Sequence, residues 1–218
     1  MCSSDLLDEC RLRIELARMY RSQSKYPKAK DLYEKALHVS KEISYKDLEA
    51  CCYRGLGTVH LSVGGYEKAK EHLGKSLAIC KEIGDRNGEA YCYANLGGVY
   101  ESVGEYDKAR EHIEKSLTIC REIGDRYGEA RCCANLGVVY ESLCKLEKAR
   151  EHIEKSLMIC TEIGERYGEA SCYENLGDVY ESVFEHEKAR KHIEKSLTIC
   201  TDRKCFLEMF FSLFMFEN

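Results

Sequence analysis

The sequence predicts an all-α solenoid of about five helix hairpins, and three observations support this fold class. First, the segment Asn87–Arg126 recurs once before and twice after itself, with a period of forty residues. Such a period is typical of arrays in which each repeat buries its surface mainly against its neighbours. Second, apolar residues such as Leu96 and Tyr100 follow one another at spacings of three and four, and no stretch alternates as a strand would. Third, glycines such as Gly84 and Gly124 recur where a helix would end.

The chain begins with a helix expected from Asp5 to Ser22, and a turn leads into a second helix near Tyr26. Pro27, the only proline, suits the first turn of that helix, where its missing N–H would have no partner anyway. The second hairpin repeats the pair, with helices expected over about 46–63 and 66–83. The predicted array covers residues 1–200 in units of about 5–43, 46–84, 86–124, 126–164 and 166–200, and residues 201–218 form a divergent aromatic tail.

The turns inside the hairpins differ in one respect. The third hairpin has Gly104 between its two helices, but the fourth has Cys144 and the fifth has Phe184 at the same position. Glycine adopts the left-handed conformation of a helix end without steric cost. The last two turns are therefore expected to form without glycine or with strain.

Composition and charge exclude several classes of function. The net charge of -5 and the absence of a basic stripe with interleaved aromatic residues argue against nucleic acid as a partner. Residues 1–5 lack the basic start and apolar core of a signal peptide, so a cytoplasmic protein is expected. Eight of the fourteen cysteines follow the repeat register, which predicts small buried thiols of a reducing compartment. These are Cys52, Cys80, Cys92, Cys120, Cys132, Cys160, Cys172 and Cys200.

One pattern of side chains identifies the type of repeat. In the third hairpin it consists of Tyr93, Leu96, Gly97, Tyr100, Ala109 and Ile113. This pattern resembles the tetratricopeptide repeat, with tyrosine in place of its tryptophan, and it recurs in the other hairpins with a weaker copy in the first. The resemblance implies a right-handed superhelix that serves as a protein-interaction scaffold or adaptor.

The period of forty residues, longer than the usual thirty-four, narrows the resemblance. The array is similar to the long-repeat arrays of Pins-type G-protein-signalling modulators and of tetratricopeptide repeat protein 28. In Pins-type members the inner groove takes extended peptides. The G-protein-binding motifs that those members carry outside the array are absent here, so a role in G-protein regulation does not follow.

The resemblance also implies which side chains would contact a ligand, because the first helix of each pair lines the concave side in this family. We expect a peptide-binding groove at the positions of these helices that face away from the packed core. The candidate residues are Arg54, Thr58, Tyr91, Asn95, Glu101, Arg131, Asn135, Val138, Glu141, Glu174, Asn175, Asp178 and Glu181.

Asn95, Asn135 and Asn175 occupy one repeat position, and an amide that both donates and accepts can pair with any peptide backbone. The opposing interpretation is that these asparagines are scaffold residues copied with the repeat. Selectivity would come from positions that vary, and acidic residues collect in the fifth hairpin at Glu174 and Asp178. We therefore expect basic residues of the ligand to face the fifth hairpin.

No motif of a catalytic site, cofactor site or metal site is present in the sequence. The histidines His72, His112, His152 and His192 recur once per repeat and are too far apart to share a metal. We expect them to be solvated surface residues. The alternative function is a structural spacer or self-assembling element, joined through repeat stacking or through the aromatic tail.

The apolar run from Cys205 to Phe216 is shorter than the roughly twenty residues of a membrane span. It is expected to be a helix folded onto the last hairpin or the irregular end of a longer array. Membrane insertion is the third and least favoured interpretation.

Overall fold

The computed structural model describes the backbone of residues 3–215 and the side chains of residues 5–201. Within that range the chain forms helices and no strand, which confirms the predicted all-α class. The first compact unit, which ends at Ile123, contains α1 (Ser3–Ser22), α2 (Tyr26–Glu42), α3 (Lys46–Ser62), α4 (Tyr66–Ile83), α5 (Arg86–Ser102) and α6 (Tyr106–Ile123). The second unit, which begins at Gly124, contains α7 (Arg126–Ser142), α8 (Leu146–Ile163), α9 (Arg166–Ser182) and α10 (His186–Met215).

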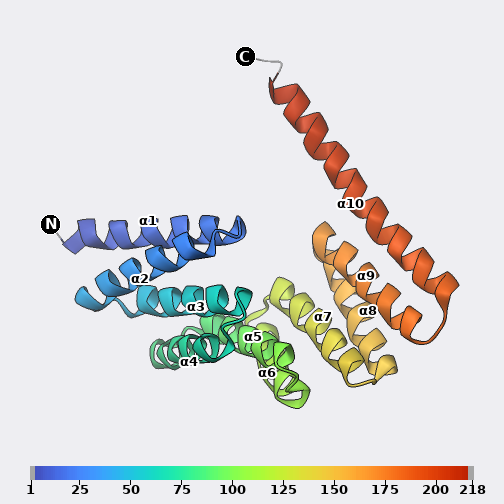
Figure 1. Ribbon diagram of the computed structural model, residues 1–218, viewed down its shortest axis with the longest axis horizontal. Helices are drawn as coiled ribbons and strands as arrows, with labels where there is room; N and C mark the ends of the chain where they lie inside the picture. The colour runs from blue at the N-terminus through green and yellow to red at the C-terminus, as the bar shows by residue number, and fades with distance from the viewer. Residues whose placement is uncertain (1–2, 216–218) are drawn as a thin grey trace. The chain divides into compact units, whose positions relative to one another are not determined.

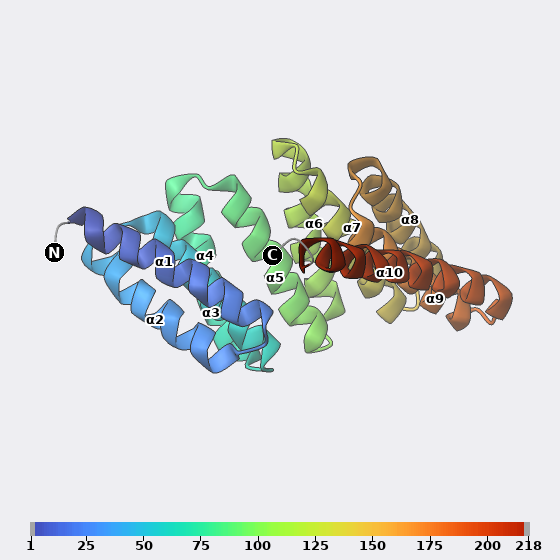
Figure 2. The same cartoon turned by 90° about the horizontal axis from the view of Figure 1, so that it is seen from above.

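Consecutive helices pair as antiparallel hairpins within each unit, as Figures 1 and 2 show. Within each unit, the second helix of a hairpin also packs on the first helix of the next. Leu73 of α4 forms one buried cluster with Leu96 and Val99 of α5, and Tyr33 of α2 does the same with Leu56 of α3. These residues are at most 7% exposed, so the hairpins of a unit share a continuous core.

Glycine in the first helix lets the two helices of a hairpin approach closely, as the motif predicts. A Cβ on Gly97 would lie 2.5 Å from Cγ1 of Ile113 and 3.3 Å from the carbonyl oxygen of Ala109. Both neighbours belong to α6, so α5 and α6 could not keep this separation with a larger residue at position 97. The role of Gly97 in helix packing is confirmed.

The turn inside each hairpin requires a residue in the left-handed region. Gly64 and Gly104 have φ of 74° and 77°, and Cys144 and Phe184 adopt 54° and 62° at the equivalent positions. A residue with a Cβ is disfavoured in this conformation by roughly 1–2 kcal/mol. The strain expected from the missing glycines is therefore present in the backbone.

Replacing Phe184 with glycine is expected to stabilise the second unit by about 1 kcal/mol, because the left-handed conformation costs glycine nothing. The side chain of Phe184 is 82% exposed, so its removal loses little packing. Urea unfolding of wild type and variant measures the gain. Phe184→Ala is the control, since alanine keeps the Cβ and should give no comparable gain. Equal stabilisation by both variants would show that the aromatic ring, not the backbone, is the source.

Helix α10 continues through residue 215 without interruption, so the first part of the aromatic tail extends the second helix of the fifth hairpin (Figure 1). Up to residue 215 the tail forms no separate helix folded back onto that hairpin. Its side chains lie outside the described residues. Ile193 and Leu197 of α10 are 49% and 62% exposed, although Ile153 at the position equivalent to Ile193 is fully buried. Among the described residues, no helix has both the length and the apolar character of a membrane span.

Candidate functional site

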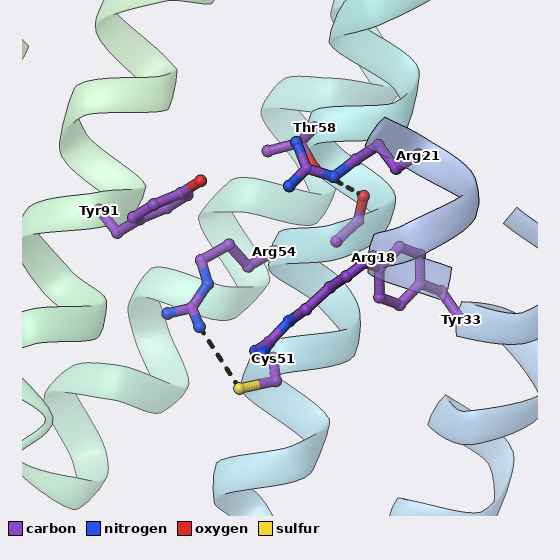
Figure 3. Close-up of a pocket in the computed structure, with 8 residues that line it drawn as sticks. Arg18, Arg21, Tyr33, Cys51, Arg54, Thr58 and Tyr91 are labelled. Atoms are coloured by element: carbon purple, nitrogen blue, oxygen red, sulfur yellow. Dashed lines mark hydrogen bonds between the residues drawn. The ribbon is translucent and has the colours of Figure 1, made fainter. Parts of the chain in front are cut away.

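The first unit contains a cavity of about 140 Å³ beside the first helices of its three hairpins (Figure 3). It is lined by Arg18, Arg21, Tyr33, Cys51, Arg54, Gly55, Thr58 and Tyr91. Helices α1, α3 and α5 supply most of these side chains, and α2 supplies Tyr33. Three of the predicted groove residues, Arg54, Thr58 and Tyr91, are brought together here. Drug-sized ligands occupy at least about 300 Å³, so the cavity suits a single chemical group.

The side chain of Arg54 is held in place by two neighbours. Its guanidinium carbon lies 5.0 Å from the centroid of the Tyr91 ring, and Nη2 is 3.4 Å from Sγ of Cys51. A guanidinium over an aromatic face is attracted by the ring quadrupole. Thr58 is buried, and its hydroxyl donates to the carbonyl of Gly55 at 2.9 Å. Thr58 thus satisfies its donor within α3 and shapes the wall.

The cavity exists because α3 departs from the repeat at one position. Gly55 stands where the later hairpins have Asn95, Asn135 and Asn175. A Cβ at Gly55 would overlap the buried ring of Tyr33. An asparagine has no room there, and the aromatic ring forms the wall instead.

Arg18 and Arg21 line the cavity from α1, and the sequence analysis missed both. An alignment of the repeats could have identified them, because the cavity arginines occupy the same repeat positions as acidic residues of the fifth hairpin. The aligned pairs are Arg18 with Asp178, Arg21 with Glu181 and Arg54 with Glu174. These arginines of the first two hairpins therefore occupy repeat positions that are acidic in the fifth hairpin.

The second unit has its own cavity, of about 190 Å³, lined by residues of α7, α8 and α9. Arg131 and Asn135, two predicted groove residues, lie in its wall. Tyr127 and Tyr167 also line it and are largely exposed. Exposed tyrosines beside a cavity provide rigid contact area of the kind that dominates binding energy at interfaces.

The three repeated asparagines, Asn95, Asn135 and Asn175, are all half-buried, so none is fully turned into the core. They differ in what they contact. Nδ2 of Asn95 donates to the carbonyl of Tyr91 at 2.7 Å, one turn earlier in α5, whereas Asn135 faces the cavity of the second unit. The amide of Asn95 thus uses a donor within its own helix. Of the three, Asn135 has the most direct access to a cavity.

The acidic residues of the fifth hairpin form an exposed row on α9. Glu174, Asp178 and Glu181 are spaced by four and three residues and so lie on one face of the helix. On α7, burial and then the charge of Asp178 raise the pKa of Glu141. Oε1 of Glu181 is 2.9 Å from Nδ1 of His186. Helices α7 and α9 therefore present an acidic surface within the second unit, made of these four carboxylates.

Eight of the thirteen predicted groove residues line neither cavity: Asn95, Asn175, the four carboxylates of the acidic surface, Glu101 and Val138. Glu101 is half-buried near the end of α5, and burial raises the pKa of its carboxyl group. Val138 is half-buried on α7. The structure does not bring them together with the residues of the cavities.

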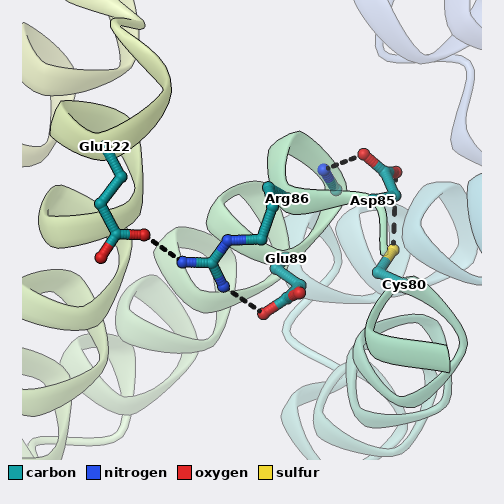
Figure 4. A network of polar contacts seen from close by, with 6 residues as sticks. Cys80, Asp85, Arg86, Glu89 and Glu122 are labelled. Carbon is teal, nitrogen blue, oxygen red and sulfur yellow. Dashed lines mark hydrogen bonds and ion pairs between the residues drawn. The ribbon is translucent and has the colours of Figure 1, made fainter. Parts of the chain in front are cut away.

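A polar network fixes where α5 begins (Figure 4), and the same network is present at α7. At α5, the carboxylate of Asp85 accepts from the backbone N–H of Gly88 at 2.8 Å, which caps the helix. Arg86 then bridges the buried Glu89, at 3.0 Å, and Glu122 at the end of α6. The same bridge recurs at Arg126, Glu129 and Glu162. This network explains the repeated linker sequence and orients the helices that carry the candidate site.

The repeated histidines are not solvated surface residues, so that expectation was wrong. Each is half-buried and packs against rings of the first helix. The ring centroids are 4.9 Å apart for His112 and Tyr100, 5.2 Å for His152 and Tyr140, and 5.1 Å for His192 and Tyr180. Burial lowers the pKa of His192. Spacing alone did not show that the hairpin interior includes this position.

The repeated cysteines are free thiols, and seven of the eight are buried, which confirms their expected role for all but the exposed Cys200. Burial raises the pKa of Cys172 to about 12, so this thiol stays protonated. Within the described side chains, no group of three His, Cys, Asp or Glu residues is arranged to hold a metal ion.

The chain belongs to the tetratricopeptide repeat family, whose model matches residues 8–82, 59–122, 88–162 and 130–202. Arrays of this family are generally non-catalytic protein-interaction scaffolds. Comparison with curated protein sequences gave no match.

Three of the solved structures with the same fold are the following. BtubC (BKLC) from P. vanneervenii superposes with a TM-score of 0.74 and 20% identity, over 93% of this chain and 91% of that chain. A signal-transduction ATPase with a tetratricopeptide repeat sensor, from Pyrococcus horikoshii, superposes with a TM-score of 0.74 and 21% identity. The match covers 90% of this chain and 31% of that chain. A Rap protein complexed with Competence and Sporulation Factor superposes with a TM-score of 0.80 and 16% identity. The match covers 88% of this chain and 54% of that chain. At these identities the likeness shows the fold alone.

Proposed function

We propose that the protein is a scaffold or adaptor that holds an extended peptide, or a segment of a partner protein, along the first helices of its hairpins. The observation that carries this proposal is the position of the two cavities. Each lies beside first helices, and each is lined by predicted groove residues, Arg54 and Tyr91 in one and Arg131 and Asn135 in the other. A relationship to Pins-type long-repeat arrays is part of the same proposal.

The pattern of variation supports a selective role for these positions. Core positions keep the same type of side chain from hairpin to hairpin, as with Leu56, Leu96, Leu136 and Leu176. The position of Arg54 instead holds Ala94, Ala134 and then Glu174. Packing explains the constant positions, and recognition of different parts of a ligand accounts for the variable ones. A Rap protein, which has a similar fold, forms a complex with Competence and Sporulation Factor, and this supports a binding role.

The proposal is tested by peptide-display selection on the folded protein. We expect recovered peptides to share a motif and to bind Asn135→Ala more weakly by about three- to tenfold, because one hydrogen bond contributes about 0.5–1.5 kcal/mol. Asn95→Ala is the matched control, since the Asn95 amide donates to its own helix and its loss should weaken binding less. Fluorescence polarisation with labelled recovered peptides measures both effects. A selection that enriches no motif, with the protein shown to be folded by circular dichroism, contradicts the proposal.

A further inference from the structure

The cavity of the first unit collects three guanidinium groups, those of Arg18, Arg21 and Arg54, and no carboxylate is among the residues that line it. Outside the lining, Glu15 pairs with one of them: its Oε1 lies 2.6 Å from Nη1 of Arg18. Arg54 is held by the Tyr91 ring and by the side chain of Cys51. Counting Glu15, the cluster of these arginines carries an excess of about two positive charges.

Arg21 has a donor that the protein leaves unused. Its Nε is buried and has no hydrogen-bond partner among the described residues. A buried donor without a partner costs roughly 1–3 kcal/mol, more when the group is charged, so such a group calls for an explanation. A ligand that accepts from this N–H would remove the penalty.

The floor of the cavity adds an uncharged donor. Tyr33 is buried, and burial raises the pKa of its hydroxyl although the charges of Arg21 and Arg18 oppose that effect. The hydroxyl therefore remains protonated at neutral pH. The cavity thus offers guanidinium N–H groups and one phenol O–H to whatever enters it.

We propose that this cavity binds a phosphoryl group, the dianionic end of a phosphate monoester. A phosphate monoester carries about -1.5 to -2 at pH 7 and has three strong acceptor oxygens, which matches the charge excess and the number of arginines. Guanidinium groups bind such oxygens in bidentate pairs. A carboxylate would neutralise only one charge and accept fewer of these donors. The volume of about 140 Å³ admits one such group and little more.

The source of the phosphoryl group is either a phosphorylated side chain of a bound peptide or a small phosphate compound. The first source rests on the proposed function, because the peptide would lie along the first helices. The second does not. The chemistry of the cavity is the same in both, so the experiment begins with inorganic phosphate and adds a peptide arm afterwards.

The test is a titration of the full chain with inorganic phosphate, at an ionic strength kept constant with chloride. Two-dimensional NMR spectra are recorded at each phosphate concentration. We expect saturable shifts of the amide resonances of Gly55 and Thr58, which lie in the cavity wall. Arg21→Gln and Arg54→Gln should each weaken phosphate binding at least about tenfold, because each removes a charged hydrogen-bond donor. Arg54→Lys, which keeps the charge but not the planar guanidinium, should fall between wild type and Arg54→Gln.

Arg11→Gln is the matched control. Arg11 is an exposed arginine of the same helix as Arg18 and Arg21 and does not line the cavity. The variant changes the net charge equally and should bind phosphate as wild type does. The proposal is overturned if Gly55 and Thr58 do not shift, or if Arg11→Gln weakens binding as much as Arg21→Gln does.

The peptide arm compares recovered peptides carrying phosphoserine or phosphotyrosine with the same peptides unmodified. Tighter binding of the phosphorylated form, lost in Arg21→Gln, identifies a phosphopeptide as the source. Phosphate binding without any such preference supports the cavity site and assigns it to a small phosphate compound. In that case the display experiment alone tests the scaffold proposal.

Discussion

Replacing Gly97 with alanine is expected to destabilise the first unit, whereas replacing its neighbour Gly98 with alanine is expected to stabilise it. A Cβ at Gly97 would lie 2.5 Å from Cγ1 of Ile113, closer than such atoms pack, and 3.3 Å from a backbone carbonyl of α6. Forcing α5 and α6 apart costs about 1–3 kcal/mol, as overpacking does elsewhere. The overlap outweighs the gain of up to about 1 kcal/mol that alanine brings to a helix interior.

Gly98 provides the comparison because it lies in the same helix and differs only in its surroundings. The nearest atom to a Cβ there is Cδ2 of Leu61 at 3.9 Å, which is ordinary contact. Gly98→Ala should therefore gain about 0.5–1 kcal/mol from reduced backbone entropy in the unfolded chain. Chemical unfolding of both variants should show changes of opposite sign. Stabilisation by both substitutions would mean that the two helices separate freely, against the close approach seen between Gly97 and Ile113.

Reversing the charges of Glu174, Asp178 and Glu181 together is expected to remove any preference for basic peptides. Each exposed charge contributes about 0.2–1 kcal/mol to an ion pair, so three reversals should weaken a lysine-rich recovered peptide by about ten- to a hundredfold. The measurement is peptide-display selection on wild type and on the triple lysine variant, followed by fluorescence polarisation. Lysine and arginine should be enriched only with wild type, and the difference should shrink at high salt because exposed charges are screened.

The control for this variant changes the net charge by the same amount at other helices. Asp107, Glu147 and Glu187 are well exposed in the first turns of α6, α8 and α10, the second helices of their hairpins. Converting these three to lysine should leave the peptide preference intact. If both triple variants lose the preference equally, overall charge and not the row on α9 attracts the peptide. If neither variant loses it, the acidic row has no part in recognition.

The hairpins could be predicted from the sequence because the repeat supplies the same evidence several times. The role of Gly97 is an example: its position beside Leu96, repeated every forty residues, indicated a close helix contact, and the structure shows the contact with Ile113. The strained turns at Cys144 and Phe184 followed in the same way from a missing glycine. Each of these features depends on local geometry that recurs in every hairpin.

The cavity of the first unit could not be predicted because it depends on what is not repeated. It needs Gly55 in place of asparagine, Tyr33 to fill the space, and arginines from two hairpins that converge. A comparison of repeats identifies the positions that they share and does not identify contacts made by residues that differ. The aromatic packing of the histidines was missed for another reason, since the first and second helices of a hairpin meet along a face that spacing does not define.

The contact between successive hairpins also affects how such a gene can change. Leu73 of α4 meets Leu96 and Val99 of α5, and every later first helix has leucine and valine at those two positions. An in-frame loss or duplication of forty residues would therefore join chemically equivalent surfaces and keep each linker intact. Unequal recombination between repeats would produce longer or shorter arrays that still fold, while the order of basic and acidic hairpins, and with it the choice of ligand, would be rearranged.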